Sequence, residues 1–222
     1  MICFSSDDLK KIALYYRDIG EKKALKKSLS SLNIDKKVHL FYSKKRNIPI
    51  CALPKLRLVL SSKCGFLSFC YNFYAFTNMY HYSIPITKSN IMCIAKFVIS
   101  HEVGHILDPD IYSTKEEYSA LLATLIDKLI EYDIDIKNKD IHKMNLPTEI
   151  EDCVLNLKKN LVSRETKAWT IAKSLLVFEN PNEEFIFNKV KEYAIATYNF
   201  GNLKSIIKEH NLEMYFKYRK YI

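Results

Sequence analysis

The chain has 222 residues, a formal net charge of +9, and 48% hydrophobic and 13% aromatic side chains. This composition excludes a disordered chain, and the length fits one domain or a domain with a small lobe. No segment reaches the ~18 apolar residues of a membrane span, and the first residues lack the basic start of a signal peptide. We therefore expect a cytoplasmic globular protein without a membrane association.

The positive charge occurs in short clusters and forms no single long stripe: Lys22-Lys23, Lys26-Lys27, Lys36-Lys37, Lys44-Lys45-Arg46, Lys158-Lys159 and Lys217 to Lys220. One explanation is a nucleic-acid or anionic-surface partner. The other is a composition rich in Lys, Ile, Asn and Tyr, of the kind that AT-rich coding produces. Because no stripe forms, we favour the second explanation and treat a nucleic-acid partner as the alternative.

The six cysteines contain no CxxC pair and no zinc-ribbon spacing. Without a secretory signal, free thiols are expected. Pairing or metal binding by Cys64 and Cys70 is the less favoured alternative.

The first 88 residues predict a mixture of helices and strands. Ser5 to Asp8 contains helix-capping residues, so a helix should run to about Ile19, with a second one after Gly20. Apolar and β-branched content predicts strands at 37–42 and 56–60. The aromatic segment 66–76 is ambiguous between helix and strand. Residues 79–86 predict an edge strand, because Pro85 has no N–H for a central position.

The remaining chain is predicted to be helical. Ser89 or Asn90 can cap a long helix over about 91–107, which Pro109 closes. Further helices are expected at about 115–132, 149–178, 182–198 and 203–218. The fold class is therefore α+β, with a mixed part over 1–88 and a helical part over 89–222, together in one compact domain.

The helix over 91–107 contains the sequence His101-Glu102-Val103-Gly104-His105. Residues four apart lie on one face of a helix, so His101 and His105 can present their imidazoles to one ion. Zinc accepts such nitrogens in a tetrahedral site. Glu102 lies at the edge of that face, where it can act as a general base on water without being a ligand.

The setting of this motif favours a metal site over a chance match. The helix is apolar nearly all round, which indicates a buried helix. Two histidines and a glutamate inside it require partners, because burying unpaired polar groups is costly. Gly104 weakens the helix, but a small residue there would let a strand or loop pass close to the metal face.

A third protein ligand is expected from a later helix. Ile111 occupies the position where another HExxH class has its third ligand, so that route is closed. Glu165 lies in the middle of an apolar face made by Leu161, Val162, Ala168, Trp169 and Ala172. It is our candidate ligand, and a buried salt bridge to a lysine or arginine is the alternative. Glu117 is the next candidate.

Asp108 follows His105 by three residues, on the same face. A carboxylate near a helix C-terminus needs a positive or N–H partner. A supporting hydrogen bond to a ligand histidine is one possibility, and a simple turn residue before Pro109 is the other. A donor for the transition-state oxyanion has no spacing signal. By residue type, the candidates are His81, Tyr112, Tyr118 and His142.

His101-Glu102-Val103-Gly104-His105, followed by Glu165 with Ala168-Trp169, resembles the gluzincin branch of HExxH zinc metallopeptidases. Small intracellular peptidases of bacteria and phages, including the ImmA/IrrE type, are similar in size and layout. The HExGH form also looks like that of the anthrax lethal factor relatives. The resemblance covers about 65 residues, and it implies a zincin-like fold: a small sheet, an active-site helix and a ligand-bearing helix.

We therefore expect a zinc metalloendopeptidase in which His101, His105 and Glu165 bind Zn²⁺ and Glu102 is the general base. The expected partner is a polypeptide that adds to the edge strand at Tyr80–Ile86. The alternative is a nucleic-acid-associated or protein-interaction module with a structural or degenerate zinc site.

Overall fold

The computed structural model describes residues 5–44, 48–138, 140–199 and 202–212. By its contacts the chain divides into two units. Unit 1 comprises Met1–Pro109 and Glu165–Ala194, and unit 2 comprises Asp110–Arg164 and Ile195–Ile222. The two expected parts met at residue 88, whereas these units change over after Pro109 and within two later helices. Each unit therefore comprises two separate segments, and the segments alternate along the chain.

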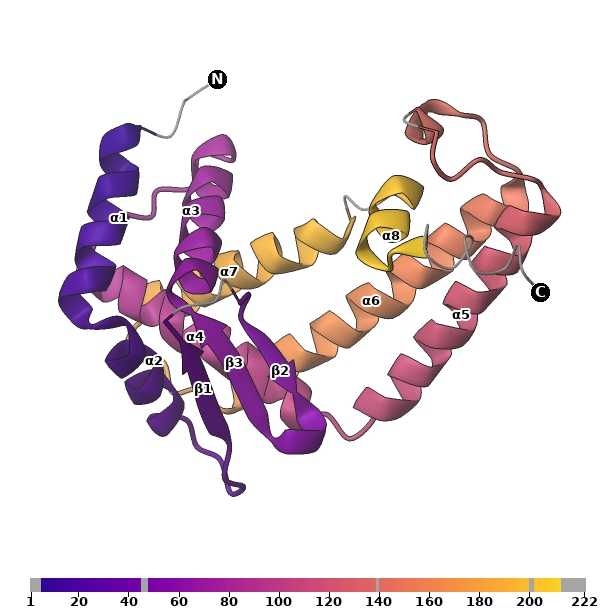
Figure 1. Cartoon of the computed structure of the whole chain (residues 1–222). Helices are drawn as coiled ribbons and strands as arrows, with labels where there is room; N and C mark the ends of the chain where they lie inside the picture. Colours follow the sequence, from indigo (N-terminus) through magenta and orange to yellow (C-terminus); the bar gives the residue numbers. More distant parts are fainter. Residues whose placement is uncertain (1–4, 45–47, 139, 200–201, 213–222) are drawn as a thin grey trace. The chain divides into compact units, whose positions relative to one another are not determined.

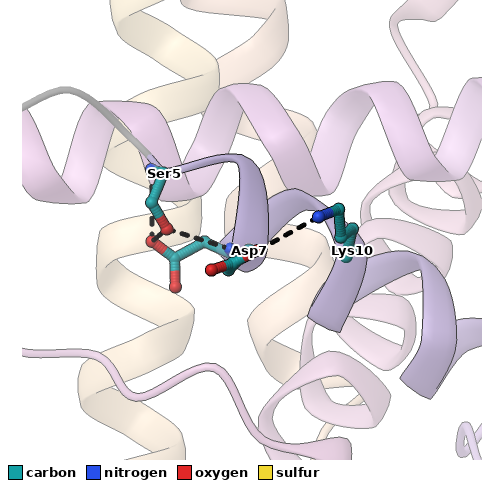
Figure 2. Close-up of polar contacts among 4 residues, drawn as sticks. Ser5, Asp7 and Lys10 are labelled. Carbon is teal, nitrogen blue, oxygen red and sulfur yellow. Dashed lines mark hydrogen bonds and ion pairs between the residues drawn. The ribbon is translucent and has the colours of Figure 1, made fainter.

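Unit 1 begins with helices α1 (Ser6–Ile19) and α2 (Glu21–Ser30), as the sequence predicts. Ser5 caps α1: its hydroxyl accepts the Asp8 N–H at 3.1 Å, and the Asp8 carboxylate accepts the Ser5 N–H at 3.3 Å. Figure 2 shows this reciprocal pair beside the ion pair of Lys10 and Asp7. Such a box satisfies two backbone donors that a helix start leaves free.

A three-stranded sheet follows, with strands in the order β1-β3-β2. β1 (His39–Ser43) pairs in parallel with the central strand β3 (Leu58–Ser62), and β2 (Cys51–Leu53) pairs with β3 antiparallel. β1 and β3 match the predicted strands, whereas β2 was not predicted. Leu40, Val59 and Ala52 are register partners on one face, where Val59 is fully buried.

The ambiguous aromatic segment is a helix, α3 (Lys63–Met79), and the edge strand expected at 79–86 is wrong. Met79 is still helical, and His81 adopts a left-handed conformation with φ 56°. The Tyr82 N–H returns to the Thr77 carbonyl at 2.8 Å. A hydrogen bond of this kind, across a residue in the left-handed conformation, is typical of a helix C-terminus. The Tyr82 N–H is therefore used to terminate α3 and does not pair with a strand.

Helix α4 (Lys88–Leu107) is the central helix of unit 1, and the sheet and helices α1, α2 and α3 all contact it (Figure 1). Thr87 caps α4 by accepting the Asn90 N–H at 3.2 Å, whereas the sequence had suggested Ser89 or Asn90 as the cap. Twelve of its residues are buried, including His101, Glu102 and Gly104. The prediction of a buried helix that carries the motif is confirmed.

The other side of unit 1 comes from the end of helix α6 (Thr148–Ser174) and most of helix α7 (Pro181–Asn199). An aromatic cluster joins them to α4. Phe97 contacts Phe178 and Phe187 with ring centroids 6.1 and 5.4 Å apart, and Phe187 contacts Trp169 at 5.5 Å. This cluster fixes α6 beside the buried helix.

Unit 2 contains helix α5 (Ile111–Glu131), the first part of α6 and the short helix α8 (Leu203–Glu209). Its core is a separate cluster of Tyr118, Leu125, Ile126, Leu129, Ile136, Ile141, Ile150, Leu157, Leu203, Ile206, Ile207 and Leu212. The Tyr118 hydroxyl and His210 Nε2 form a hydrogen bond of 2.7 Å. Unit 2 is thus held by its own apolar contacts.

The fold is α+β, mostly helical with one small sheet, as predicted. Among the described residues, no helix combines the length and the apolar character that crossing a bilayer requires.

Candidate metal centre

The two motif histidines lie one turn apart on α4, with ring centroids 4.6 Å apart. His101 is 7% exposed, and His105 is partly buried. The predicted convergence of the two imidazoles follows from the helix repeat alone.

Glu165, from α6, completes the group. Its Oε2 atom lies 3.0 Å from His101 Nε2 and 3.3 Å from His105 Nε2. The Glu165 side chain is 5% exposed. The structure thus places the predicted third ligand, Glu165, against both histidines. These contacts are with imidazoles and not with the lysine or arginine of the alternative salt bridge.

A close approach of two helices makes this contact possible. A Cβ added to Gly104 would collide with the backbone carbonyl of Ala168 on α6. Gly104 is therefore required for the helices to meet. The contact lies one residue before His105 on α4 and three residues after Glu165 on α6. The sequence had suggested a passing strand or loop at Gly104, and the passing element is a helix.

Trp169 covers one side of the site. Its ring stacks on His101, with centroids 4.3 Å apart and planes inclined by 19°, and the indole is 1% exposed. Because Trp169 follows Glu165 by one helical turn, α6 supplies both the carboxylate and the surface that orients the imidazole.

Burial and hydrogen bonding set the protonation states of this group. Burial would raise the pKa of Glu165, but hydrogen bonds from His101 and His105 outweigh it and hold that pKa well below its usual range. Burial lowers the pKa of His101, and the Glu165 contact only partly opposes it. The neutral form of the His101 imidazole is thereby favoured. Its Nδ1 is buried without a hydrogen-bond partner among the described residues.

Glu102 is 8% exposed, beside the three donors and not among them. Burial and the charge of Glu165 raise its pKa well above the usual value, and a hydrogen bond from the Ala52 N–H partly opposes this. Ala52 is the middle residue of β2. The sheet therefore holds the carboxylate that the sequence assigns as general base, through a backbone donor that no sequence pattern revealed.

Asp108 at the end of α4 is paired with a cation. Its Oδ1 atom lies 2.8 Å from Lys167 Nζ on α6, and its side chain is fully buried. Lys167 is the positive partner that a carboxylate at a helix C-terminus requires. A supporting hydrogen bond that Asp108 accepts from a ligand histidine stays a prediction.

The remaining candidates have other surroundings. Glu117 accepts a hydrogen bond from Asn160 Nδ2 at 2.9 Å within unit 2. His81 is exposed at the end of α3. Tyr112 and Tyr118 belong to unit 2, and the side chain of His142 lies outside the described residues. Five cysteines, Cys64 and Cys70 among them, are free thiols.

Sequence reasoning missed β2 and its residue Cys51. Burial raises the pKa of the Cys51 thiol, and the charge of Glu102 adds to the effect, so the thiol lies near the site. Pro49 and Pro54 flank the three-residue strand. A three-residue segment is too short to show the alternation of apolar and polar residues that predicts a strand. The two prolines were the one sequence signal for the edge of a sheet.

The donor set fits a zinc ion. The ligand atoms of His101, His105 and Glu165 all lie within 4.8 Å of one another. Tetrahedral sites with bonds of about 2.0–2.2 Å place neighbouring ligand atoms roughly 3.3–3.5 Å apart. The observed 3.0 and 3.3 Å are close to that spacing. Two imidazoles and one carboxylate are also a protein donor set of catalytic zinc sites that keep a fourth position open.

Comparison of the chain with protein-family models, with curated proteins and with solved structures finds no match.

Proposed function

We propose that this chain is a zinc-dependent peptidase with a zincin-like fold, in which His101, His105 and Glu165 hold the metal and Glu102 is the general base. The observation that carries the proposal is the convergence of three metal donors with a separate buried carboxylate beside them. A structural zinc site has four protein ligands and no need for a fifth, non-ligating acid.

Zinc in such a site supplies Lewis-acid polarisation of a carbonyl and lowers the pKa of water. The chain supplies the base. Glu102 is buried and close to another carboxylate, so it holds a proton more firmly than an exposed glutamate does. The Ala52 N–H keeps the carboxylate oriented while it accepts and returns that proton. Trp169 and the Gly104–Ala168 contact fix the ligands and shield one side of the site from water.

An unpaired strand edge favours a polypeptide as substrate. Within the described residues, β2 pairs with β3 on one side only, and its middle residue bonds to Glu102. An extended peptide could add to this edge and bring a backbone carbonyl next to Glu102. β2 thereby takes the role that we expected for Tyr80–Ile86, which is not a strand.

Metal content tests the ligand assignment. Elemental analysis of the purified protein should find one zinc per chain. His101→Ala should lose nearly all of it, because one of three protein ligands is gone. His39→Ala is the matched control, since His39 is exposed on β1, and it should keep the metal. Full zinc content in His101→Ala would refute the assignment.

Hydrolysis tests the role of Glu102. Glu102→Gln should keep zinc and fold but lose at least about a hundredfold in rate on an unfolded protein or a peptide library. Glu116→Gln, at an exposed position of α5, is the control and should keep full activity. If Glu102→Gln loses its zinc, Glu102 is a ligand. If the wild type holds zinc and cleaves no peptide, the site has another function.

A further inference from the structure

The positive charge of the chain is concentrated in one segment. Residues 20–46 contain nine Lys and Arg against two Asp and Glu, which is +7 of the total +9. Lys22-Lys23 and Lys26-Lys27 lie on α2, Lys36 and Lys37 precede β1, and Lys44 follows β1 directly. α2 and β1 are in contact within unit 1 (Figure 1).

The outward face of α2 consists of lysines. Ala24, Leu25 and Ser28 are buried, and α2 contacts α4. Lys22, Lys23, Lys26 and Lys27 are all exposed and cover an arc of about 140° on the opposite side. The lysines form two pairs four residues apart, and like charges at that spacing destabilise a helix.

These lysines have no acidic partner within the described part of the chain. The same holds for the exposed Lys36, Lys37 and Lys44. By contrast, Lys10, Lys143 and Lys189 each pair with an acidic side chain three residues away. The positive charge of this segment is therefore not compensated by neighbouring carboxylates, whereas Lys10, Lys143 and Lys189 are each neutralised by one.

An aromatic side chain lies between the two ends of this basic segment. Phe41 is 52% exposed on β1, four residues after Lys37 and three before Lys44. Its register partner is Leu60, on the sheet face opposite the buried Val59. Within the described residues β1 pairs only with β3, so it is an edge of the sheet. A planar group could stack on this ring while its anionic backbone contacts the lysines.

We propose that α2 and β1 form a binding surface for single-stranded nucleic acid: Lys22, Lys23, Lys26 and Lys27 contact phosphates, and Phe41 stacks on a base. Surfaces of this class combine a basic track with aromatic platforms and read little sequence. A duplex keeps its bases stacked inside, out of reach of Phe41. A membrane-surface helix needs a free apolar face, but the apolar face of α2 is buried against α4.

The test is fluorescence anisotropy with a labelled mixed-sequence oligonucleotide of about 12 nucleotides, at salt concentrations from about 50 to 200 mM. The wild type should bind, with log K falling linearly with log salt. Replacing Lys22, Lys23, Lys26 and Lys27 by Gln should reduce the steepness of that slope by about 3, at roughly 0.7 per phosphate contact on a single strand.

Two further comparisons separate a site from a general charge effect. Changing Lys88, Lys137, Lys159 and Lys208 to Gln removes four exposed charges elsewhere and should leave affinity and slope nearly unchanged. Phe41→Ala should weaken binding about fivefold or more with the slope intact, while Phe41→Tyr should bind as the wild type does. All variants should give the far-ultraviolet circular dichroism of the wild type, because every changed side chain is exposed.

Several results would overturn the proposal. If the four distributed changes cost as much affinity as the four on α2, only net charge matters. If the duplex of the same sequence binds equally well and Phe41→Ala has no effect, no base stacks on β1. If the α2 variant loses binding to phosphatidylserine vesicles while no form binds the oligonucleotide, the surface serves a membrane. None of these outcomes bears on the zinc site, which involves other residues.

Discussion

The imidazoles and the carboxylate at the candidate site hold one another in place before any metal binds. One oxygen of Glu165 contacts both histidines, at 3.0 and 3.3 Å. A buried carboxylate without such donors would be strongly destabilising. The three side chains are therefore preorganised. A metal ion would replace the protons between their ligand atoms, and no side chain would have to move in from a distance.

Trp169 is the one tryptophan of the chain, and it stacks on His101. Its fluorescence should therefore report directly on metal binding. Adding zinc to metal-free protein should change the Trp169 emission until one equivalent is bound, because the charge in the stacked imidazole plane changes. His101→Ala should show no such change. An emission change in that variant as large as in the wild type would place the zinc elsewhere.

At the scale of elements, the site depends on how closely α4 and α6 approach each other. Gly104 faces the backbone carbonyl of Ala168, so no side chain fits between the helices at that point. A helical glycine costs up to about 1 kcal/mol relative to alanine. Gly104 lowers the stability of α4 by this amount, but the close contact that it allows brings Glu165 within reach of the two histidines.

We predict that Gly104→Ala destabilises the protein by roughly 1–3 kcal/mol, because overpacking outweighs the gain in helix propensity. Urea denaturation measures the loss, and elemental analysis should show less zinc. Adding Ala168→Gly should not restore stability, since the collision is with the backbone of Ala168. Ser119→Ala on the exposed side of α5 is the control for helix propensity alone. Equal or higher stability of Gly104→Ala would mean that the helices can separate without loss.

At the scale of the whole molecule, the ligands flank the first segment of unit 2 in the sequence. His101 and His105 precede Asp110, where unit 2 begins, and Glu165 follows Arg164, where its first segment ends. All three ligands belong to unit 1. A metal ion would therefore link α4 to α6 within unit 1, whereas the apolar core of unit 2 contains none of the ligands.

We predict that chelation of the metal destabilises unit 1 selectively. At a free zinc concentration of about 100 to 1,000 times Kd, binding stabilises the folded state by about 2.7–4.1 kcal/mol. Hydrogen exchange followed by mass spectrometry should show faster exchange in α4 and in the end of α6 after chelation, with α5 and α8 unchanged. His101→Ala should not respond to the chelator. A uniform change in both units would contradict a metal that serves unit 1 alone.

The sequence by itself determined the parts of the site that depend on local geometry. The helix repeat places His101 and His105 on one face, whatever the rest of the chain does. The apolar neighbours of Glu165 likewise indicate a buried carboxylate, because they lie within two turns of it on the same helix. The capping residue Ser5 fixed the start of α1 in the same way.

Only the tertiary structure decided the features that join distant segments. The Ala52 N–H reaches Glu102 from 50 residues away, and β2 is too short to show alternation. The segment at Tyr80–Ile86 has the composition of a strand, yet its hydrogen bonds end α3 through the left-handed His81. The binding surface that we propose joins the lysines of α2 to Phe41 through the contact of α2 with β1, which lie apart in the sequence. Side-chain periodicity records which face of an element is buried, but the partner that buries it depends on contacts between residues far apart in the chain.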